Sequence, residues 1–89
     1  MKINENYVLR QIADTWVVLP LGETTLDFNG MMTLNETGSL LWKLLEKGCE
    51  QSDLVEYLLS EYEVTRDEAE ADVERFLNKL RNIDCLENL

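Results

Sequence analysis

The spacing of apolar residues changes near residue 35, and this change limits the fold more than any other feature of the sequence. Before that point, β-branched and aromatic residues form short runs, as in residues 15–19, which is typical of strands. Beyond it, apolar residues recur every three or four positions, as they do along one face of a helix. Strands that precede the helices, without alternating with them, indicate the α+β class.

The front of the chain predicts a β-hairpin. Residues 7–12 and 15–19 are rich in β-forming side chains, and Ala13 and Asp14 offer a turn between them. Pro20 has no amide hydrogen to donate to a sheet, so the second strand should end near residues 19–21.

A short third strand is expected at residues 31–34, after the turn signal Asn29-Gly30. Both turn residues tolerate positive φ angles, which tight turns require. Residues 24–28 fit either a short strand or an ordered loop. The expected sheet is therefore three-stranded and antiparallel.

Three helices are expected after the sheet. Asn35 can accept hydrogen bonds from the first-turn amides of the first helix, and Gly48 can end that helix in a left-handed conformation. The second helix should begin near residues 51–53, and the third at a capping box formed by Thr65 and Glu68. The apolar faces are expected at Leu40, Leu41, Leu44 and Leu45, then at Leu54, Val55, Leu58, Leu59 and Tyr62, and then at Ala69, Val73, Phe76, Leu77 and Leu80.

These elements predict a single domain over residues 1–89, with a β-rich part at residues 7–34 and a helical part at residues 35–83. The expected fold is a three-stranded antiparallel β-sheet followed by a three-helix, winged-helix-like bundle. A chain of 89 residues can bury one core but leaves little room for a deep catalytic cleft.

The residue types exclude most catalytic chemistry. The chain has no His, so it lacks the usual general base and a common zinc ligand. Its glycines stand singly, and its acidic residues lack the spacing of a calcium loop. Cys49 and Cys85 lie far apart and are expected to be reduced structural thiols. We expect no metal, no cofactor and no enzymatic activity.

Charge and hydropathy limit the partners. A net charge of −10 at pH 7 opposes binding to nucleic acid or to an anionic membrane, because phosphate groups require clustered Lys and Arg. No apolar run approaches the ~20 residues that span a bilayer, and the first six residues have no signal-peptide core. The expected location is the cytoplasm.

Peptide binding remains as a function that this chain can support. If the third strand lies at the sheet edge, an extended peptide can pair with its free backbone groups. Met31 and Met32 suit such a site because their flexible thioethers adapt to different apolar partners. The alternative is that residues 31–34 simply face the core. Trp16 and Trp42 are expected to be core or core-edge aromatics.

Several motifs, in order along nearly the whole chain, resemble the PqqD-like family, which takes its name from a protein of pyrroloquinoline quinone synthesis. The motifs are Leu34-Asn35-Glu36-Thr37-Gly38, Leu41-Trp42 and Leu44-Leu45 with Gly48, Leu58 and Tyr62-Glu63-Val64, and Asp72-Val73 with Phe76-Leu77 and Leu80.

The resemblance implies three strands followed by a winged-helix bundle, together known as a precursor-peptide recognition element. Such domains bind the leader segment of a ribosomally made peptide and present it to a modifying enzyme, often a radical S-adenosylmethionine enzyme. The leader adds as a strand beside the third strand, in the groove that this strand forms with the third helix. Carried onto this sequence, the site would comprise Met31, Met32, Thr33 and Leu34 on the strand and Asp72, Arg75, Phe76 and Lys79 on the helix.

Residues 35–38 are expected to shape this groove from behind rather than to contact the peptide. One departure from the family lies at Asp84 and Cys85, where many relatives place a small residue such as Gly before an apolar pair. The sequence therefore does not decide where the third helix ends.

Two alternatives remain. A winged-helix DNA-binding regulator would share the layout, although the third helix is rich in Asp and Glu. A homodimer would use the exposed strand edge for a second copy instead of a leader peptide.

Overall fold

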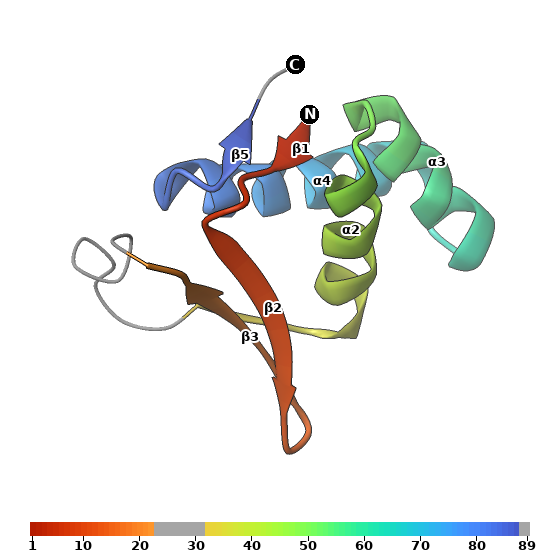
Figure 1. The fold of residues 1–89 in the computed structure, drawn as a ribbon. Coiled ribbons are helices and arrows are strands. Elements are labelled where there is room, and N and C mark those ends of the chain that lie inside the picture. The colour runs from red at the N-terminus through yellow and green to blue at the C-terminus, as the bar shows by residue number, and fades with distance from the viewer. Residues whose placement is uncertain (23–31, 88–89) are drawn as a thin grey trace.

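The structure is a computed structural model that describes residues 1–22 and 32–87 (Figure 1). The expectations for residues 24–28, for the Asn29-Gly30 turn and for Met31 lie outside the described residues. Within them the prediction of an α+β chain, with a three-stranded sheet and three helices, is confirmed.

The main sheet contains β2 (Tyr7–Ile12), β3 (Thr15–Pro20) and β4 (Met32–Leu34), in that spatial order and all antiparallel. The hairpin between β2 and β3 turns through two residues, of which Ala13 has a φ of 55°. Its tip extends away from the helices (Figure 1). β4 lies at the edge of this sheet, as the peptide-binding hypothesis requires.

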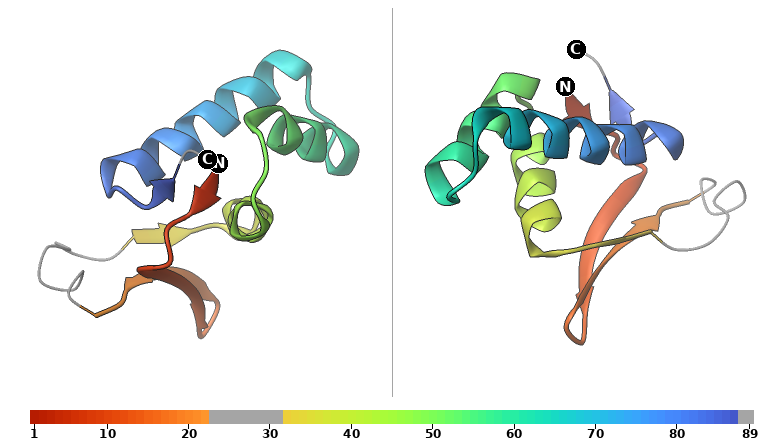
Figure 2. Two further views of the ribbon diagram at one scale, coloured as in Figure 1. Left: turned by 45° about the horizontal axis from the view of Figure 1, so that its top comes forward. Right: turned by 180° about the vertical axis from the view of Figure 1, so that it is seen from behind.

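A second, two-stranded sheet was not predicted. β1 (Lys2–Ile3) pairs antiparallel with β5 (Leu86–Glu87), so the two ends of the described chain lie side by side (Figure 2). The Asn4 amide also donates to the Cys85 carbonyl at 2.7 Å. These contacts close the fold between its first and last elements.

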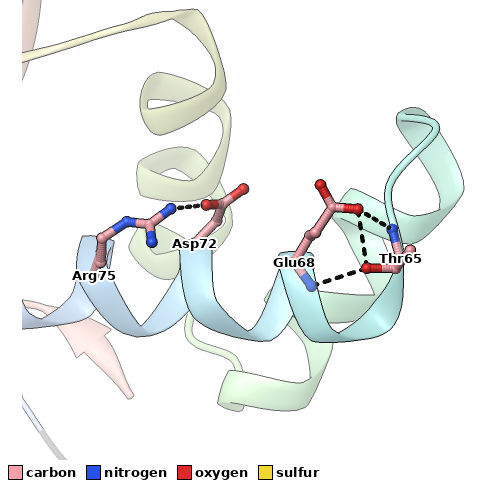
Figure 3. A network of polar contacts seen from close by, with 4 residues as sticks. All are labelled: Thr65, Glu68, Asp72 and Arg75. Carbon is pink, nitrogen blue, oxygen red and sulfur yellow. Dashed lines mark hydrogen bonds and ion pairs between the residues drawn. The ribbon is translucent and has the colours of Figure 1, made fainter.

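The helices are α2 (Glu36–Lys47), α3 (Gln51–Glu61) and α4 (Arg66–Asn82). The Asn35 side chain caps α2 by accepting from the Gly38 amide at 2.8 Å. The capping box at the start of α4 is also present: the Glu68 amide donates to the Thr65 hydroxyl at 3.1 Å, and the Thr65 amide donates to the Glu68 carboxylate at 3.2 Å (Figure 3).

The core joins the inner face of the sheet to all three helices. Its largest fully buried side chains are Trp42, Leu45, Leu54, Leu77 and Leu80. Trp16 packs at the margin of this core, under the ammonium group of Lys43 at 4.5 Å. Both tryptophans are therefore core or core-edge residues, as expected.

Two apolar faces differ in detail from the predicted ones. The buried side of α2 is centred on Leu41, Trp42 and Leu45, whereas Leu40 and Leu44 are only half-buried. Tyr62 follows the end of α3 and is 38% exposed. Its hydroxyl accepts a hydrogen bond from Thr37 at 3.3 Å, so its phenol group serves a polar contact.

The end of α4 explains the departure at Asp84. This residue has a φ of 59°, the left-handed conformation that favours Gly. Its amide donates to the Arg81 carbonyl at 3.0 Å, and the Cys85 amide donates to the Leu80 carbonyl at 3.1 Å. This pair of bonds is a Schellman motif. The helix therefore ends as a glycine would end it, although the residue is Asp.

Cys85 is fully buried in the core and Cys49 is half-buried, and both are free thiols. Burial, with a smaller contribution from the Asp84 carboxylate, raises the pKa of the Cys85 thiol to about 12. The folded protein thus holds this thiol neutral, in keeping with a structural role. None of the helices that the structure describes is long and apolar enough to cross a membrane.

Replacing Asp84 with Gly should stabilise the protein by about 0.5–1 kcal/mol, because Gly adopts the left-handed conformation without a steric penalty. The substitution also removes a negative charge from the negative end of the α4 dipole. Urea unfolding followed by circular dichroism measures the change. Asp84→Ala is the matched control, since it removes the charge but keeps a Cβ atom. Equal stability of the two variants would contradict the backbone explanation.

Stability should fall as the pH rises from about 9 to about 12, because the unfolded Cys85 thiol ionises near its ordinary pKa of 9.0 and the folded thiol does so only near 12. The contribution is fully present below pH 9. Urea unfolding of the parent and of Cys85→Ala at pH 7, 9 and 10.5 measures this contribution. The difference between the two proteins removes the effect of tyrosine and lysine ionisation, which both share. Identical pH dependence in both proteins would contradict it.

Candidate functional site

A groove of about 610 Å³ opens between the edge strand β4, the start of α2, and α4. Six of the eight residues predicted to bind a partner line it: Thr33, Leu34, Asp72, Arg75, Phe76 and Lys79. The structure therefore brings two strand residues next to four helix residues that lie about forty positions further along the chain.

Of the two remaining predicted residues, only Met32 lies within the part of the chain that the structure describes. Met32 is absent from the described lining of the groove, and its half-buried side chain packs against the core. Met31 lies outside the described residues. On β4, therefore, the Met32 side chain packs against the core, the buried Leu34 side chain contributes to the groove lining, and the strand itself forms the open edge.

The hairpin determines which backbone groups of β3 point toward β4. Ile12 and Thr15 are direct partners across a two-residue turn, so they form a hydrogen-bonded pair. Along an antiparallel strand, successive residues direct their N–H and C=O groups to opposite sides. Thr15 and Val17 therefore face β2, and Trp16 and Val18 face β4.

The same alternation identifies the free group of β4. Trp16 is paired with Leu34 and Val18 with Met32, so these two β4 residues direct their backbone groups to β3. The N–H and C=O of Thr33, between them, point to the open edge. Thr33 is thus the described residue that offers a donor and an acceptor to an added strand.

The floor of the groove is apolar. Leu34, Leu41, Leu58 and Phe76 contribute it from four different elements, and all four are buried, with Phe76 the most accessible at 8% exposure. A partner that reaches this floor must bring an apolar side chain, because a polar group would lose its hydration there without gaining a hydrogen bond.

Gly38 allows the groove to form at the junction of β4 and α2. A Cβ atom at this position would lie 3.2 Å from the Leu34 Cβ and 3.2 Å from the Asn35 Oδ1. Both distances are tighter than ordinary van der Waals contact. The absence of a side chain lets the first turn of α2 approach the end of the strand.

The rim of the groove along α4 is charged. Arg75 donates to the Asp72 carboxylate, and the two side chains form an ion pair on the helix surface (Figure 3). Lys79 follows Arg75 by four residues and therefore lies on the same side of the helix. This wall presents two cations and one carboxylate.

Residues at the start of α2 line the groove directly, which differs from the expectation that they would shape it from behind. Asn35, Thr37 and Gly38 lie on its wall, and Leu41 and Leu58 lie on its floor. The positions of Asn35, Thr37 and Gly38 could have been predicted from the sequence. Only Asn35 separates β4 from α2, so the first turn of the helix lies beside the strand edge. Leu58 could not be predicted in this way, since its position depends on how α3 packs.

The described residues show no group of three or more His, Cys, Asp or Glu side chains that could hold a metal ion. What the groove offers is an open strand edge, an apolar floor and a charged rim. These are the parts required to bind an extended peptide by strand addition.

Comparison with known proteins points to the same kind of molecule. The family model for coenzyme PQQ synthesis protein D (PqqD) matches residues 15–86. No curated protein sequence matches the chain.

Two solved structures share the fold. One is described as TbiB1 in complex with the TbiA(beta) leader peptide; it is 35% identical, has a TM-score of 0.80, and the match covers 100% of this chain and 98% of that one. The other is lasso peptide synthetase B1 complexed with the leader peptide; it is 25% identical, has a TM-score of 0.77, and the match covers 98% of this chain and 96% of that one. With the family model covering most of its length, this chain belongs to the PqqD family.

Proposed function

We propose that this protein is a non-catalytic adaptor that binds the leader segment of a ribosomally synthesised precursor peptide and presents it to a modifying enzyme. The observation that carries the proposal is the open edge of β4 beside an apolar groove. Both similar structures are complexes of a related protein with a leader peptide, which supports the same class of ligand here.

Binding would proceed by strand addition to β4. The Thr33 N–H and C=O would pair with the leader backbone, which gives affinity with little regard to sequence. Alternate leader side chains would then face the groove, where the apolar floor formed by Leu34, Leu41, Leu58 and Phe76 accepts an apolar one. Sequence preference would come from this floor and from the charged rim.

Catalysis in this proposal belongs to a partner. The chain has no His, the usual partner of a catalytic nucleophile, so in this proposal its own residues bind and orient the peptide only. The identity of the partner as a radical S-adenosylmethionine enzyme rests on the family resemblance alone. The second neighbour is named as part of a lasso peptide synthetase, so the partner we propose is the broader class of peptide-modifying enzymes.

The DNA-binding alternative gains no support from the structure. Three of the four cations on α4 are in ion pairs, Arg66 with Glu56, Arg75 with Asp72 and Arg81 with Glu74. The helix also carries five carboxylates against four cations, and this net negative charge opposes binding to the phosphate backbone.

The proposed ligand bears on where the protein acts and on whether it can form a dimer. A ribosomally made precursor is available in the cytoplasm, where we place the adaptor. A homodimer through β4 would occupy the same edge as the leader, so the two modes of binding would compete.

Thr33→Pro should weaken leader binding about tenfold or more, because proline removes the backbone donor at the open edge. The pairing of β4 with β3 should persist, since it uses the backbone groups of Met32 and Leu34. Calorimetric titration with the amino-terminal part of a short peptide encoded beside this gene measures the change.

Thr33→Val is the matched control, because it alters the side chain and keeps the amide; its affinity should stay within about twofold of the parent. Thermal unfolding of all three proteins verifies that the fold persists. Equal affinity of the proline variant and the parent, with the fold intact, would rule out strand addition at this residue.

Incubating the precursor with the adaptor alone should leave its mass unchanged by mass spectrometry. Adding the modifying enzyme encoded nearby should produce the modified peptide, and faster with the parent adaptor than with Thr33→Pro. A mass change produced by the adaptor alone would contradict the non-catalytic assignment.

A further inference from the structure

We propose that the α4 rim of the groove binds a carboxylate of the leader peptide, and that Asp72 holds Arg75 as an internal competitor until the leader arrives. The inference rests on the proposed function, because it assigns the charge preference of the same groove.

The sign of the groove is opposite to that of the molecule. The chain carries a net charge of −10, yet among the described residues the charged ones on the groove lining are two cations, Arg75 and Lys79, and one carboxylate, Asp72. The amino end of α2 also borders the groove, but the Glu36 carboxylate in its first turn and the Asn35 cap offset the positive end of this helix dipole, so the charge preference comes from the two cations. At contact distance these groups favour an anionic side chain.

Lys79 is free to receive that anion. Among the residues that the structure describes, it is the α4 cation without a hydrogen bond or ion pair, whereas Arg66, Arg75 and Arg81 each have a carboxylate partner. Its position on the groove lining therefore places an unneutralised charge where a bound peptide would lie.

Arg75 becomes available by exchanging one carboxylate for another. The side chains of Arg75 and Asp72 are 72% and 49% exposed, and an ion pair this open to solvent contributes little to stability. A leader carboxylate can therefore replace Asp72 at the guanidinium at low cost. Asp72 would in this way weaken the binding of every acidic leader without preventing it.

The spacing suits an extended peptide. Arg75 and Lys79 are separated by about 6 Å along the helix axis, and alternate residues of a strand are about 6.6–6.8 Å apart. Phe76 lies between the two cations in sequence and belongs to the apolar floor. Lys79 follows Phe76 by three residues, about 4.5 Å along the helix axis, so a leader that runs beside α4 with an apolar residue on Phe76 can reach Lys79 with Asp or Glu at its next groove-facing position, two residues away.

A selection from a random twelve-residue peptide library displayed on phage tests this preference and does not require the leader sequence. Immobilised parent protein should enrich peptides with Asp or Glu two positions from an apolar residue. Lys79→Glu should lose this enrichment and favour Lys or Arg. Lys47→Glu, which changes the net charge equally outside the groove, should behave as the parent does.

Asp72→Asn then tests the internal competition. Synthetic copies of the enriched peptides should bind this variant about three- to tenfold more tightly by fluorescence anisotropy, and copies with Asn or Gln in place of the acid should show no gain. Equal binding of the acidic and amide copies to the parent would overturn the carboxylate preference, and no gain for Asp72→Asn would overturn the competitor role.

Failure of the proposed function gives a different result. If enriched peptides lose binding in Thr33→Pro but show no acidic preference, strand addition stands and the rim inference is overturned. If none of the recovered peptides depends on Thr33, strand addition itself is overturned, together with the inference that rests on it.

Discussion

The close packing of the first turn of α2 on the end of β4 is the contact on which the rest of the structure depends. Gly38 permits it, because a side chain there would press on Leu34 and Asn35 at 3.2 Å. Asn35 then fixes the direction of the helix by capping it. These two residues set the helix against the end of the edge strand, so the wall of the groove at this junction follows from a local constraint.

Features with a local cause could be predicted from the sequence. The hairpin, the Asn35 cap and the Thr65 capping box each depend on residues a few positions apart, and each is present. The β1–β5 sheet could not be predicted, because it joins two-residue strands from opposite ends of the chain that are too short to show a period. The left-handed Asp84 was also hidden, since the sequence lacks the Gly that marks such a turn.

The residues of the candidate site also fall into those that the sequence could predict and those that it could not. The strand edge and the α4 residues could be inferred from family motifs, and the structure brings Thr33, Leu34, Asp72, Arg75, Phe76 and Lys79 to one groove. Leu41 and Leu58 on its floor depend on how three helices pack, which no local pattern encodes. The role of Met32 could not be decided from sequence, because a methionine on an edge strand fits both a ligand contact and a core position, and here its side chain packs against the core.

The pairing of β1 with β5 has a consequence for how such a domain can be used. Its first and last strands run antiparallel as direct neighbours, so the path into the fold and the path out of it meet at one place, while the groove is formed by β4, α2 and α4. A domain with this geometry can be spliced into a surface loop of a larger protein with two short linkers. The host enzyme would then carry its peptide receptor covalently, at a fixed high local concentration.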